Sequence, residues 1–444
     1  MDNVQVGRED ISSKFFYRVN IIESIRQIFK HRDLRMRIIF TLLILLIVRL
    51  ITHTPMPGVD LAALAQVFSR NQFLGLIDLF SGGSLNQFSI ALMGVAPFIN
   101  ASIIIQLMGM ALPSVEALQK EGEYGRRKLS QYTRLLTVPL ALIQAYGMIA
   151  LLQRSDINIL GELTILKLLA ILLIVTAGTI LLMWLGELIS EHGIGNGISL
   201  IIFAGILARL PQGLASTVAL FDTSKLFEVL VFIALAVATV YFVVYITEGQ
   251  RNIPIAYAGR GGGNRLYGGQ SNYLPLRVNQ AGVIPIIFAI SLLLFPGLIA
   301  SFFASARTAW LASGAQWVQH AFQDQWVYGA LYFLLVVFFT YFYTWVIFKP
   351  DQVSENIQKS GGFIPGIRPG RQTVEFLSYV TNRITLAGAI FLGLIAVLPT
   401  IVQGATHIQT LTLGGTGLLI VVSVALELMR QLRAQLIMKR YDAI

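Results

Sequence analysis

The sequence predicts an all-α polytopic membrane protein with ten transmembrane helices. Three observations support this: hydrophobic residues make up 55% of the 444 residues, charged residues make up only 13%, and the mean hydropathy is +0.70. Apolar runs long enough to cross a bilayer core of about 30 Å recur along the whole chain. These runs are continuous rather than alternating, which excludes a membrane β-barrel.

The ten apolar runs define the predicted organisation of the chain. They lie near residues 36–52, 88–108, 132–153, 164–186, 195–210, 226–246, 280–303, 327–348, 383–403 and 411–430. The expected parts are an N-terminal segment 1–35, a first half 36–210, a second half 226–430 and a C-terminal tail 431–444. The N-terminal segment is polar and basic, and no small-residue cleavage pattern follows the first run, so we expect that run to remain as an anchor.

Basic residues gather in alternate loops. If the N-terminus is cytoplasmic, the inside segments hold about 24 Lys and Arg residues and the outside loops about five. This asymmetry predicts that both termini are cytoplasmic and accounts for the net charge of +10. The inside loops 247–279 and 349–381 are long for a compact bundle, which favours a docking surface for an acidic partner such as ribosomal RNA or a motor protein. Topology alone is the alternative explanation of their charge.

A short internal repeat relates the two halves. The stretch Gly94-Val95-Ala96-Pro97 recurs as Gly282-Val283-Ile284-Pro285, and a weaker echo pairs residues 195–197 with 415–417. Five spans separate each pair, so the second half is predicted to enter the membrane in the opposite direction, with a pathway between the halves. Each proline removes a backbone donor, so we expect the second and seventh spans to be bent or broken in the middle.

The sequence offers little material for catalysis. The ionisable residues in or near the spans lie close to span ends, where snorkelling to the interface is expected: Arg49, Lys167, Glu187, Arg209 and Glu427. The chain has no phosphate-binding loop, no cysteine and no His/Glu cluster with metal-ligand spacing. We therefore expect no catalytic residue, no cofactor and no metal site.

Branched aliphatic residues near the repeat motifs are the candidate lining of a pathway. They are Val95, Ile99, Ile103, Ile198, Ile202, Ile284, Ile287 and Ile420. Any one of them suits ordinary helix packing, but as a set they predict a hydrophobic constriction that closes by dewetting. The amphipathic segment 61–87 ends in Phe80-Ser81-Gly82-Gly83-Ser84. The two glycines give a flexible joint, so the segment is either a mobile stopper or an exterior loop.

Ordered motifs along nearly the whole chain resemble the SecY family of protein-export channels. They are Pro55-Met56-Pro57-Gly58-Val59-Asp60, Phe80-Ser81-Gly82-Gly83, Ala101-Ser102-Ile103-Ile104-Ile105-Gln106-Leu107, Glu121-Gly122-Glu123, Gly125-Arg126-Arg127-Lys128, Gln131-Tyr132-Thr133-Arg134, Met183-Trp184-Leu185-Gly186-Glu187, Gly193-Ile194-Gly195-Asn196-Gly197-Ile198-Ser199, Leu274-Pro275-Leu276-Arg277-Val278-Asn279, Ala281-Gly282-Val283-Ile284-Pro285 and Phe363-Ile364-Pro365-Gly366-Ile367-Arg368-Pro369-Gly370.

The resemblance implies two inverted five-helix halves around an hourglass pore, with a plug and a lateral gate into lipid. The implied pore ring is Val95, Ile99, Ile198, Ile202, Ile287 and Ile420, with Ile284 as a substitute for Ile287. The implied plug runs from about residue 73 to 87 and includes Leu76, Phe80, Ser81, Gly82 and Gly83. Spans 2 and 7 would face spans 3 and 8 across the gate, with Asn100, Ile103, Gln106 and Gln144 as gate residues. Interhelical hydrogen bonding explains the polar ones equally well.

The resemblance also implies partners and a location. Docking residues for a SecA-like motor ATPase or the ribosome would be Arg251, Arg260, Arg265, Arg277, Arg368 and Arg371, with Arg368 required by the motor. The loop tip at 259–265 carries fewer basic residues than is usual in the family, so docking there is expected to be weaker or to be shared with Arg251 and Arg277. SecE-like and SecG-like small membrane subunits, unfolded preproteins, signal peptides and membrane lipid complete the set, and the site of action is the cytoplasmic (inner) membrane.

Two other function classes remain open from the residues alone. A secondary transporter for a small solute is compatible with an inverted repeat, although the scarcity of charges in the middle of the spans argues against it. A membrane-embedded assembly factor without a conduit is the third class.

Overall fold

The computed structural model describes residues 31–70, 78, 81–153, 161, 164–219, 226–257, 272–303, 308–406 and 412–441. Four of the predicted site residues lie outside these ranges, namely Leu76, Phe80, Arg260 and Arg265. The same holds for most of the N-terminal segment, for the end of the C-terminal tail and for most of the predicted plug before residue 81.

A helix lies in each of the ten predicted ranges. The described helices are α3 (Arg32–His53), α4 (Leu61–Arg70), α6 (Ala96–Ala111), α7 (Pro113–Lys120), α8 (Glu123–Gln153), α9 (Ile165–His192), α10 (Gly197–Ala219), α11 (Leu226–Glu248), α12 (Ile284–Phe303), α13 (Ala309–Gln323), α14 (Gln325–Ile347), α15 (Pro350–Lys359), α16 (Arg371–Thr406) and α17 (Thr412–Tyr441). The strands are β1 (Gln250–Tyr257), β2 (Asn272–Arg277) and β3 (Gly362–Phe363). The prediction of a mostly helical chain is confirmed.

Four stretches of the described chain are long and apolar enough to cross a membrane. They are α8, α9, residues 371–398 of α16 and the stretch Trp326–Lys359, which covers α14 from its second residue and the whole of α15. The pair α6 and α7, bent by 102° at their junction, adds a fifth if it is one span. Ten spans in two inverted halves therefore stays a prediction.

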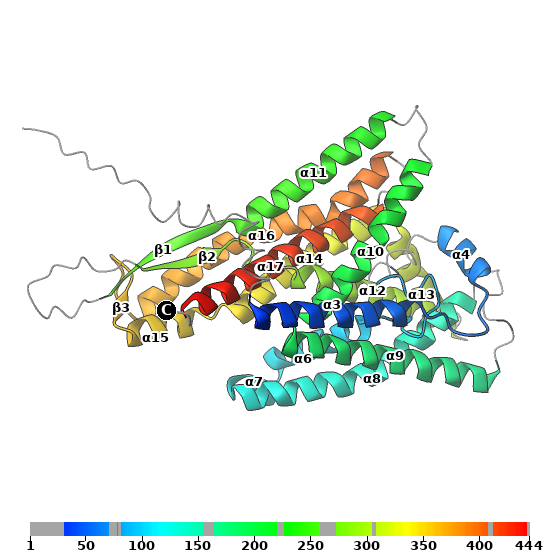
Figure 1. The fold of residues 1–444 in the computed structure, drawn as a ribbon, viewed down its shortest axis with the longest axis horizontal. Coiled ribbons are helices and arrows are strands. Elements are labelled where there is room, and N and C mark those ends of the chain that lie inside the picture. The colour runs from blue at the N-terminus through cyan, green and yellow to red at the C-terminus, as the bar shows by residue number, and fades with distance from the viewer. Residues whose placement is uncertain are drawn as a thin grey trace, which may run out of the picture.

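The long helices run along the long axis of the molecule (Figure 1). Helix α12 packs against α6, α8, α13 and α14, and α16 packs against α14 and α17. The small sheet, α15 and the C-terminal end of the described chain lie at one end of the bundle, whereas α4 and α13 lie at the other (Figure 1).

The repeated Gly-Val-x-Pro motif performs the same local task in both halves. Gly94 and Gly282 adopt left-handed backbone conformations, with φ of 56° and 67°, and the helix starts two residues later in each case. Pro97 and Pro285 are the second residues of α6 and α12. The expected break in mid-span is therefore wrong, because proline in the first helical turn lacks only a donor that has no intrahelical partner there.

The second predicted span starts eight residues later than expected, and the weaker echo is not structurally equivalent. Residues 81–95 form turns before α6, with Phe88 at a φ of 43°. Asn196 caps α10 by accepting a hydrogen bond from the Ser199 backbone at 3.2 Å, whereas residues 415–417 lie inside α17. Only the first motif is thus a repeat in structure as well as in sequence.

The two long loops predicted to be cytoplasmic meet in one antiparallel sheet with the order β2-β1-β3. Strand β1 pairs with β2 from Gln250 opposite Arg277 to Ile255 opposite Asn272, and its end pairs with β3. Five buried apolar residues join the sheet to the start of α16: Ile253, Leu276, Ile364, Leu377 and Val380. The all-α prediction misses this sheet because its strands are short and lie among polar residues.

Candidate pore and plug site

The structure brings all seven predicted ring residues to one hydrophobic cluster. Val95, Ile99, Ile202, Ile287 and Ile420 are buried in it, and Ile198 and Ile284 pack against it half-buried. They come from α10, α12, α17, α6 and the residue before α6. None faces outward, so the residues retain the burial that a constriction requires.

Ile198 differs from the rest of this set. Its side chain lies over Gly186 of α9, where a Cβ on Gly186 would come within 2.6 Å of the Ile198 Cδ1 atom. Ile198 therefore packs against a neighbouring helix, while Ile202, one turn later on α10, faces the interior pocket described next.

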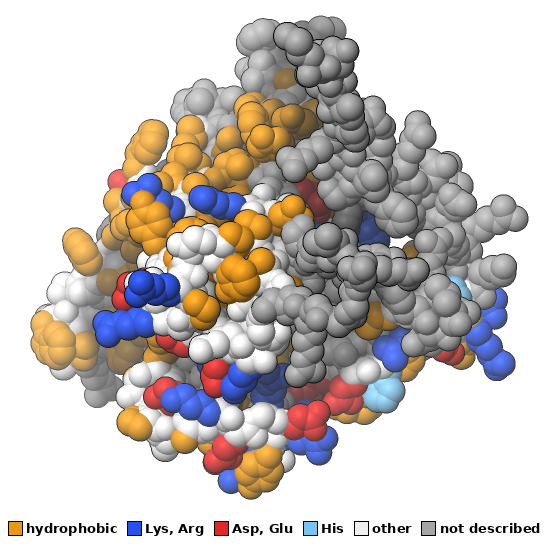
Figure 2. Space-filling model, turned by 90° about the vertical axis from the view of Figure 1, so that its left-hand side faces the viewer, with side chains coloured by type: hydrophobic (Ala, Val, Ile, Leu, Met, Phe, Trp, Pro, Cys, Tyr) orange, Lys and Arg blue, Asp and Glu red, His pale blue; other side chains and the backbone are white. Residues whose placement is uncertain are grey.

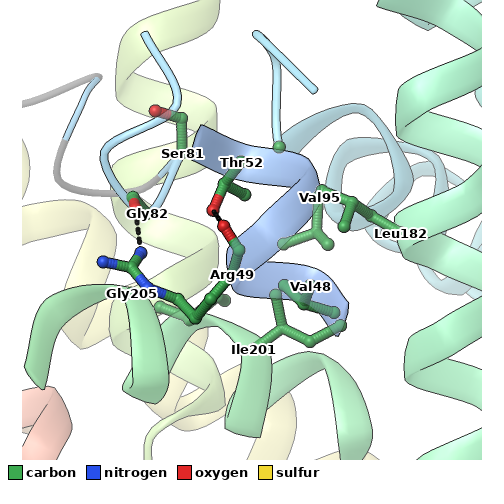
Figure 3. Close-up of a pocket in the computed structure, with 11 residues that line it drawn as sticks. Val48, Arg49, Thr52, Ser81, Gly82, Val95, Leu182, Ile201 and Gly205 are labelled. Carbon is green, nitrogen blue, oxygen red and sulfur yellow. Dashed lines mark hydrogen bonds between the residues drawn. The ribbon is translucent and has the colours of Figure 1, made fainter. Parts of the chain in front are cut away.

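A small pocket joins the predicted ring to the predicted plug. It is lined by Val48, Arg49, Thr52, Ser81, Gly82, Gly94, Val95, Leu182, Ile201, Ile202 and Gly205. Figure 3 shows Gly82 lying between α3 and α10, close to Arg49 and Gly205. Val95 and Ile202 of the predicted ring therefore line the same pocket as Ser81 and Gly82 of the predicted plug.

The buried carboxylate of Asp78 organises residues 81–94, which include the described end of the predicted plug. The Asp78 side chain is 2% exposed, and its Oδ1 accepts hydrogen bonds from the Leu85 and Asn86 backbone N–H groups at 3.0 and 2.9 Å. The Ser81 hydroxyl donates to the same carboxylate at 3.4 Å. These bonds wrap the chain around one charge, which is costly to bury unless it is paired.

Two arginines supply positive charge to this segment from outside it. The Arg209 guanidinium of α10 forms an ion pair with Asp78, and Arg49 Nη1 of α3 donates to the Gly82 carbonyl at 2.8 Å (Figure 3). Both arginines were expected to snorkel toward the membrane surface. That expectation is wrong because buried acceptors lie within reach of both side chains.

Glycine contacts fix the position of the plug turn, which is the turn at Ser81, Gly82 and Gly83 in the predicted plug. Gly82 and Gly83 have φ values of 72° and 89°, which residues with a side chain rarely adopt. A Cβ on Gly205 of α10 would lie 2.5 Å from the Gly82 Cα atom, and a Cβ on Gly94 would lie 2.9 Å from the Ser81 Cα atom. The plug turn therefore fits against α10 and the start of α6 backbone to backbone.

The predicted gate residues lie where α6, α8, α12 and α14 meet. The Tyr343 hydroxyl of α14 donates to Gln106 Oε1 of α6 at 2.7 Å, and Gln106 Nε2 donates to Ser102 at 2.9 Å. Phe288 of α12 packs edge-on against Tyr343, with ring centroids 5.1 Å apart. Helices α6, α12 and α14 are thus closed against one another by one hydrogen bond and a pair of aromatic rings.

The other gate residues are buried but less clearly partnered. Asn100 and Ile103 of α6 are buried, as is Gln144 of α8. Gln144 Nε2 has no hydrogen-bond partner within the described part of the chain. This buried donor lies on the helix that packs against both α6 and α12.

The end of the bundle that carries the sheet is studded with Lys and Arg side chains, interspersed with acidic ones (Figure 2). The predicted docking residues Arg251, Arg368 and Arg371 are exposed here. Arg277 ends β2, where partial burial and the nearby Arg430 lower the pKa of its guanidinium. Arg371 contacts Glu375 at 3.2 Å, while Arg251 and Arg368 have no ion-pair partner among the described residues.

Sequence reasoning missed three residues of this site. They are Asp78, which lies in the amphipathic segment 61–87, and Tyr343 and Ile201, which lie within predicted spans. A single acid within the apolar run Phe73-Leu74-Gly75-Leu76-Ile77-Asp78-Leu79-Phe80 was the available signal for the first. No three His, Cys, Asp or Glu side chains in the described part of the chain come close enough to hold a metal ion.

Comparison with known sequences gives a consistent family. A family model described as SecY matches residues 89–429. The chain is 44% identical over 432 residues to the protein translocase subunit SecY of Streptomyces scabiei, and the alignment covers 93% of this chain and 97% of that protein. It is 42% identical over 436 residues to the protein translocase subunit SecY of Mycobacterium tuberculosis, covering 92% and 96%.

Comparison with solved structures supports the fold. A structure described as that of a protein conducting channel aligns with a TM-score of 0.62 at 18% identity, covering 90% of this chain and 91% of that chain. Sec61 in the canine ribosome-channel complex from the endoplasmic reticulum aligns with a TM-score of 0.59 at 17% identity, with the same coverage.

Proposed function

This chain belongs to the SecY family of protein translocase subunits, and from that premise we propose that it is the channel through which unfolded preproteins cross the cytoplasmic membrane. The preprotein enters at the end that carries the sheet, displaces the predicted plug, residues 73–87, and passes the aliphatic ring. Apolar segments leave sideways into lipid through the gate at which α6 and α12 face α8 and α14. A partner ATPase or the translating ribosome supplies the energy.

The observation that carries this proposal is the pocket that the plug turn shares with two residues of the ring. Ser81 and Gly82 sit in the same pocket as Val95 and Ile202, inside the bundle. Aliphatic side chains form no hydrogen bonds with the passing chain, so they impose no sequence requirement on it. A polypeptide that passes this point must first move the turn, which makes the arrangement a closed channel.

The proposed partners follow from the charge of one end and from the family. Exposed Arg251 and Arg368 beside the sheet suit phosphates of ribosomal RNA or an acidic motor surface. The canine Sec61 relative was solved in a ribosome-channel complex, which fits this proposal. SecE-like and SecG-like subunits would complete the complex, with both termini in the cytoplasm.

Crosslinking of an arrested preprotein tests the pathway. We expect a photoreactive side chain at Ile99, Ile202 or Ile420 to label a preprotein halted midway, because these positions lie at the proposed waist on α6, α10 and α17. The readout is the mass shift of the labelled preprotein on a gel.

Two control positions give this experiment its contrast. Ile189 is fully buried on α9 away from the pocket, and Leu173 is exposed on the same helix. Neither is expected to label the preprotein. Labelling of Ile189 as strong as that of the three waist positions, or labelling of none of the three, removes the pore assignment.

Tyr343→Phe is expected to ease opening of the gate. The change deletes the hydroxyl that donates to Gln106 and leaves the ring against Phe288. A hydrogen bond of this kind is worth about 1 kcal/mol, so the balance shifts toward separation of α6 from α14 by about fivefold. Export of a reporter with a weakened signal sequence measures the shift and should rise by a similar factor.

Tyr341→Phe is the matched control for this variant. The Tyr341 hydroxyl reaches the Asn382 carbonyl only at 3.5 Å and at an exposed position, so its loss should leave export unchanged. Equal export by the two variants would show that the Tyr343 bond does not hold the gate.

A further inference from the structure

Every tryptophan of this protein lies exposed at the surface of the folded chain. The sequence holds five, and their exposed fractions run from 52% for Trp184 to 75% for Trp326. Tryptophan is a large residue that is highly buried on average in soluble proteins, and it is enriched where a membrane meets water. The five positions therefore mark where this protein contacts the interfacial layers of the bilayer.

Helix α14 shows the two levels of these layers. Trp326 and Trp345 lie near its two ends, about 28 Å apart along a straight helix, close to the thickness of a bilayer core. Leu334 and Phe338 between them are also exposed. Asp324 caps the first end by accepting from the Trp326 backbone at 2.8 Å, which places a charged group at the headgroup level beside Trp326.

Helix α13 precedes Asp324 directly and has an unusual outer face. Trp310 and Trp317, seven residues apart and therefore on one face, are both about three-quarters exposed, whereas Ala315 is buried. The 15 residues contain no Asp, Glu, Lys or Arg. A helix that faced bulk water would carry charges on its outer face, and this one is too short to cross a bilayer.

We propose that α13 lies flat in the headgroup layer of the membrane, with Trp310 and Trp317 inserted at the boundary between headgroups and acyl chains. Only Asp324 separates it from α14, on which Leu334 and Phe338 are exposed. Its inner face packs against α12, so the lipid contact holds the adjoining end of that helix at a fixed depth. This proposal is independent of the proposed function.

Tryptophan fluorescence of the full chain in lipid vesicles tests the proposal. Two variants each keep one tryptophan of α13, with the other four tryptophans changed to phenylalanine, and the vesicles carry bromine near the headgroups or near the chain ends. We expect both Trp310 and Trp317 to be quenched about twofold more by the shallow bromine, and iodide in the water to quench little. A Leu334→Trp variant without the other tryptophans is the control for the bilayer centre and should respond most to the deep bromine.

The depths of the two side chains decide the outcome. In a flat helix Trp310 and Trp317 lie at the same depth, whereas in an upright helix they differ by about 10 Å. The proposal would be overturned if the two side chains lay at different depths or if only iodide quenched them. It would also be overturned if neither bromine nor iodide quenched them, because protein would then cover α13. The wild-type chain, measured with the same quenchers, guards against misfolding of the variants.

Discussion

Arg209→Gln is expected to make the resting channel leak. The substitution leaves the Asp78 carboxylate 2% exposed and without its ionic partner, while its backbone donors at Leu85 and Asn86 remain. Removing one partner of a buried pair costs about 3–5 kcal/mol, which favours release of the predicted plug by about 100-fold or more. Anion efflux from vesicles that contain the purified protein measures the leak.

A second substitution separates the charge from the rest of the contact. Asp78→Asn keeps a side-chain oxygen that accepts from Leu85 and Asn86 but removes the charge that Arg209 balances. A double variant that combines Asp78→Asn with Arg209→Gln should therefore leak less than Arg209→Gln alone, because no carboxylate is left unpaired. Equal leakage of the two would contradict an electrostatic role.

Arg134→Gln is the matched control. Arg134 pairs with Glu187 at 2.8 Å, but this pair is partly exposed and lies between α8 and α9. Water screens such pairs, so they contribute little, and the variant should hold anions as the wild-type protein does.

The sequence was sufficient to predict where the helices lie, but it was insufficient to predict the structure around the plug turn. Hydropathy is a local property, so all ten apolar runs contain a helix. The start of α6 was misplaced because Phe88 and Gly94 adopt left-handed conformations that nothing in an apolar run reveals. The pairing of β1 with β3 joins segments more than 100 residues apart, which no local pattern specifies.

The local sequence also did not reveal that the side chains of Arg49 and Arg209 point into the bundle. Arg209 and its partner Asp78 are 131 residues apart, and Arg49 and Gly82 are 33 residues apart. An arginine near a span end has the interface as its default partner, and only the fold shows that a buried acceptor is nearer. Five of the seven predicted ring residues are buried, as their apolar character favours, whereas Ile198 is half-buried and packs against Gly186 of α9. That they line a pore stays a prediction.

Gly205→Ala is expected to open the same leak without altering any charge. Alanine is favoured over glycine inside a helix by about 1 kcal/mol, so α10 itself should become more stable. The added methyl group, however, would lie 2.5 Å from the Gly82 Cα atom, and backbone cannot yield as a flexible side chain does. The turn that carries Ser81 and Gly82 must then move off α10 and away from Val95 and Ile202.

Gly314→Ala isolates the effect of the added methyl group. Gly314 lies in α13, and nothing comes within 4 Å of a Cβ built there. This variant should keep the wild-type seal and be at least as stable to heat as the wild type. Gly205→Ala should also be no less stable than the wild type but should lose the seal in the same efflux assay. Loss of stability together with the seal would mean that the methyl group disrupts the bundle. A seal intact at Gly205→Ala would mean that the plug turn does not close the channel by resting on α10, and the leak of Arg209→Gln would then need another cause.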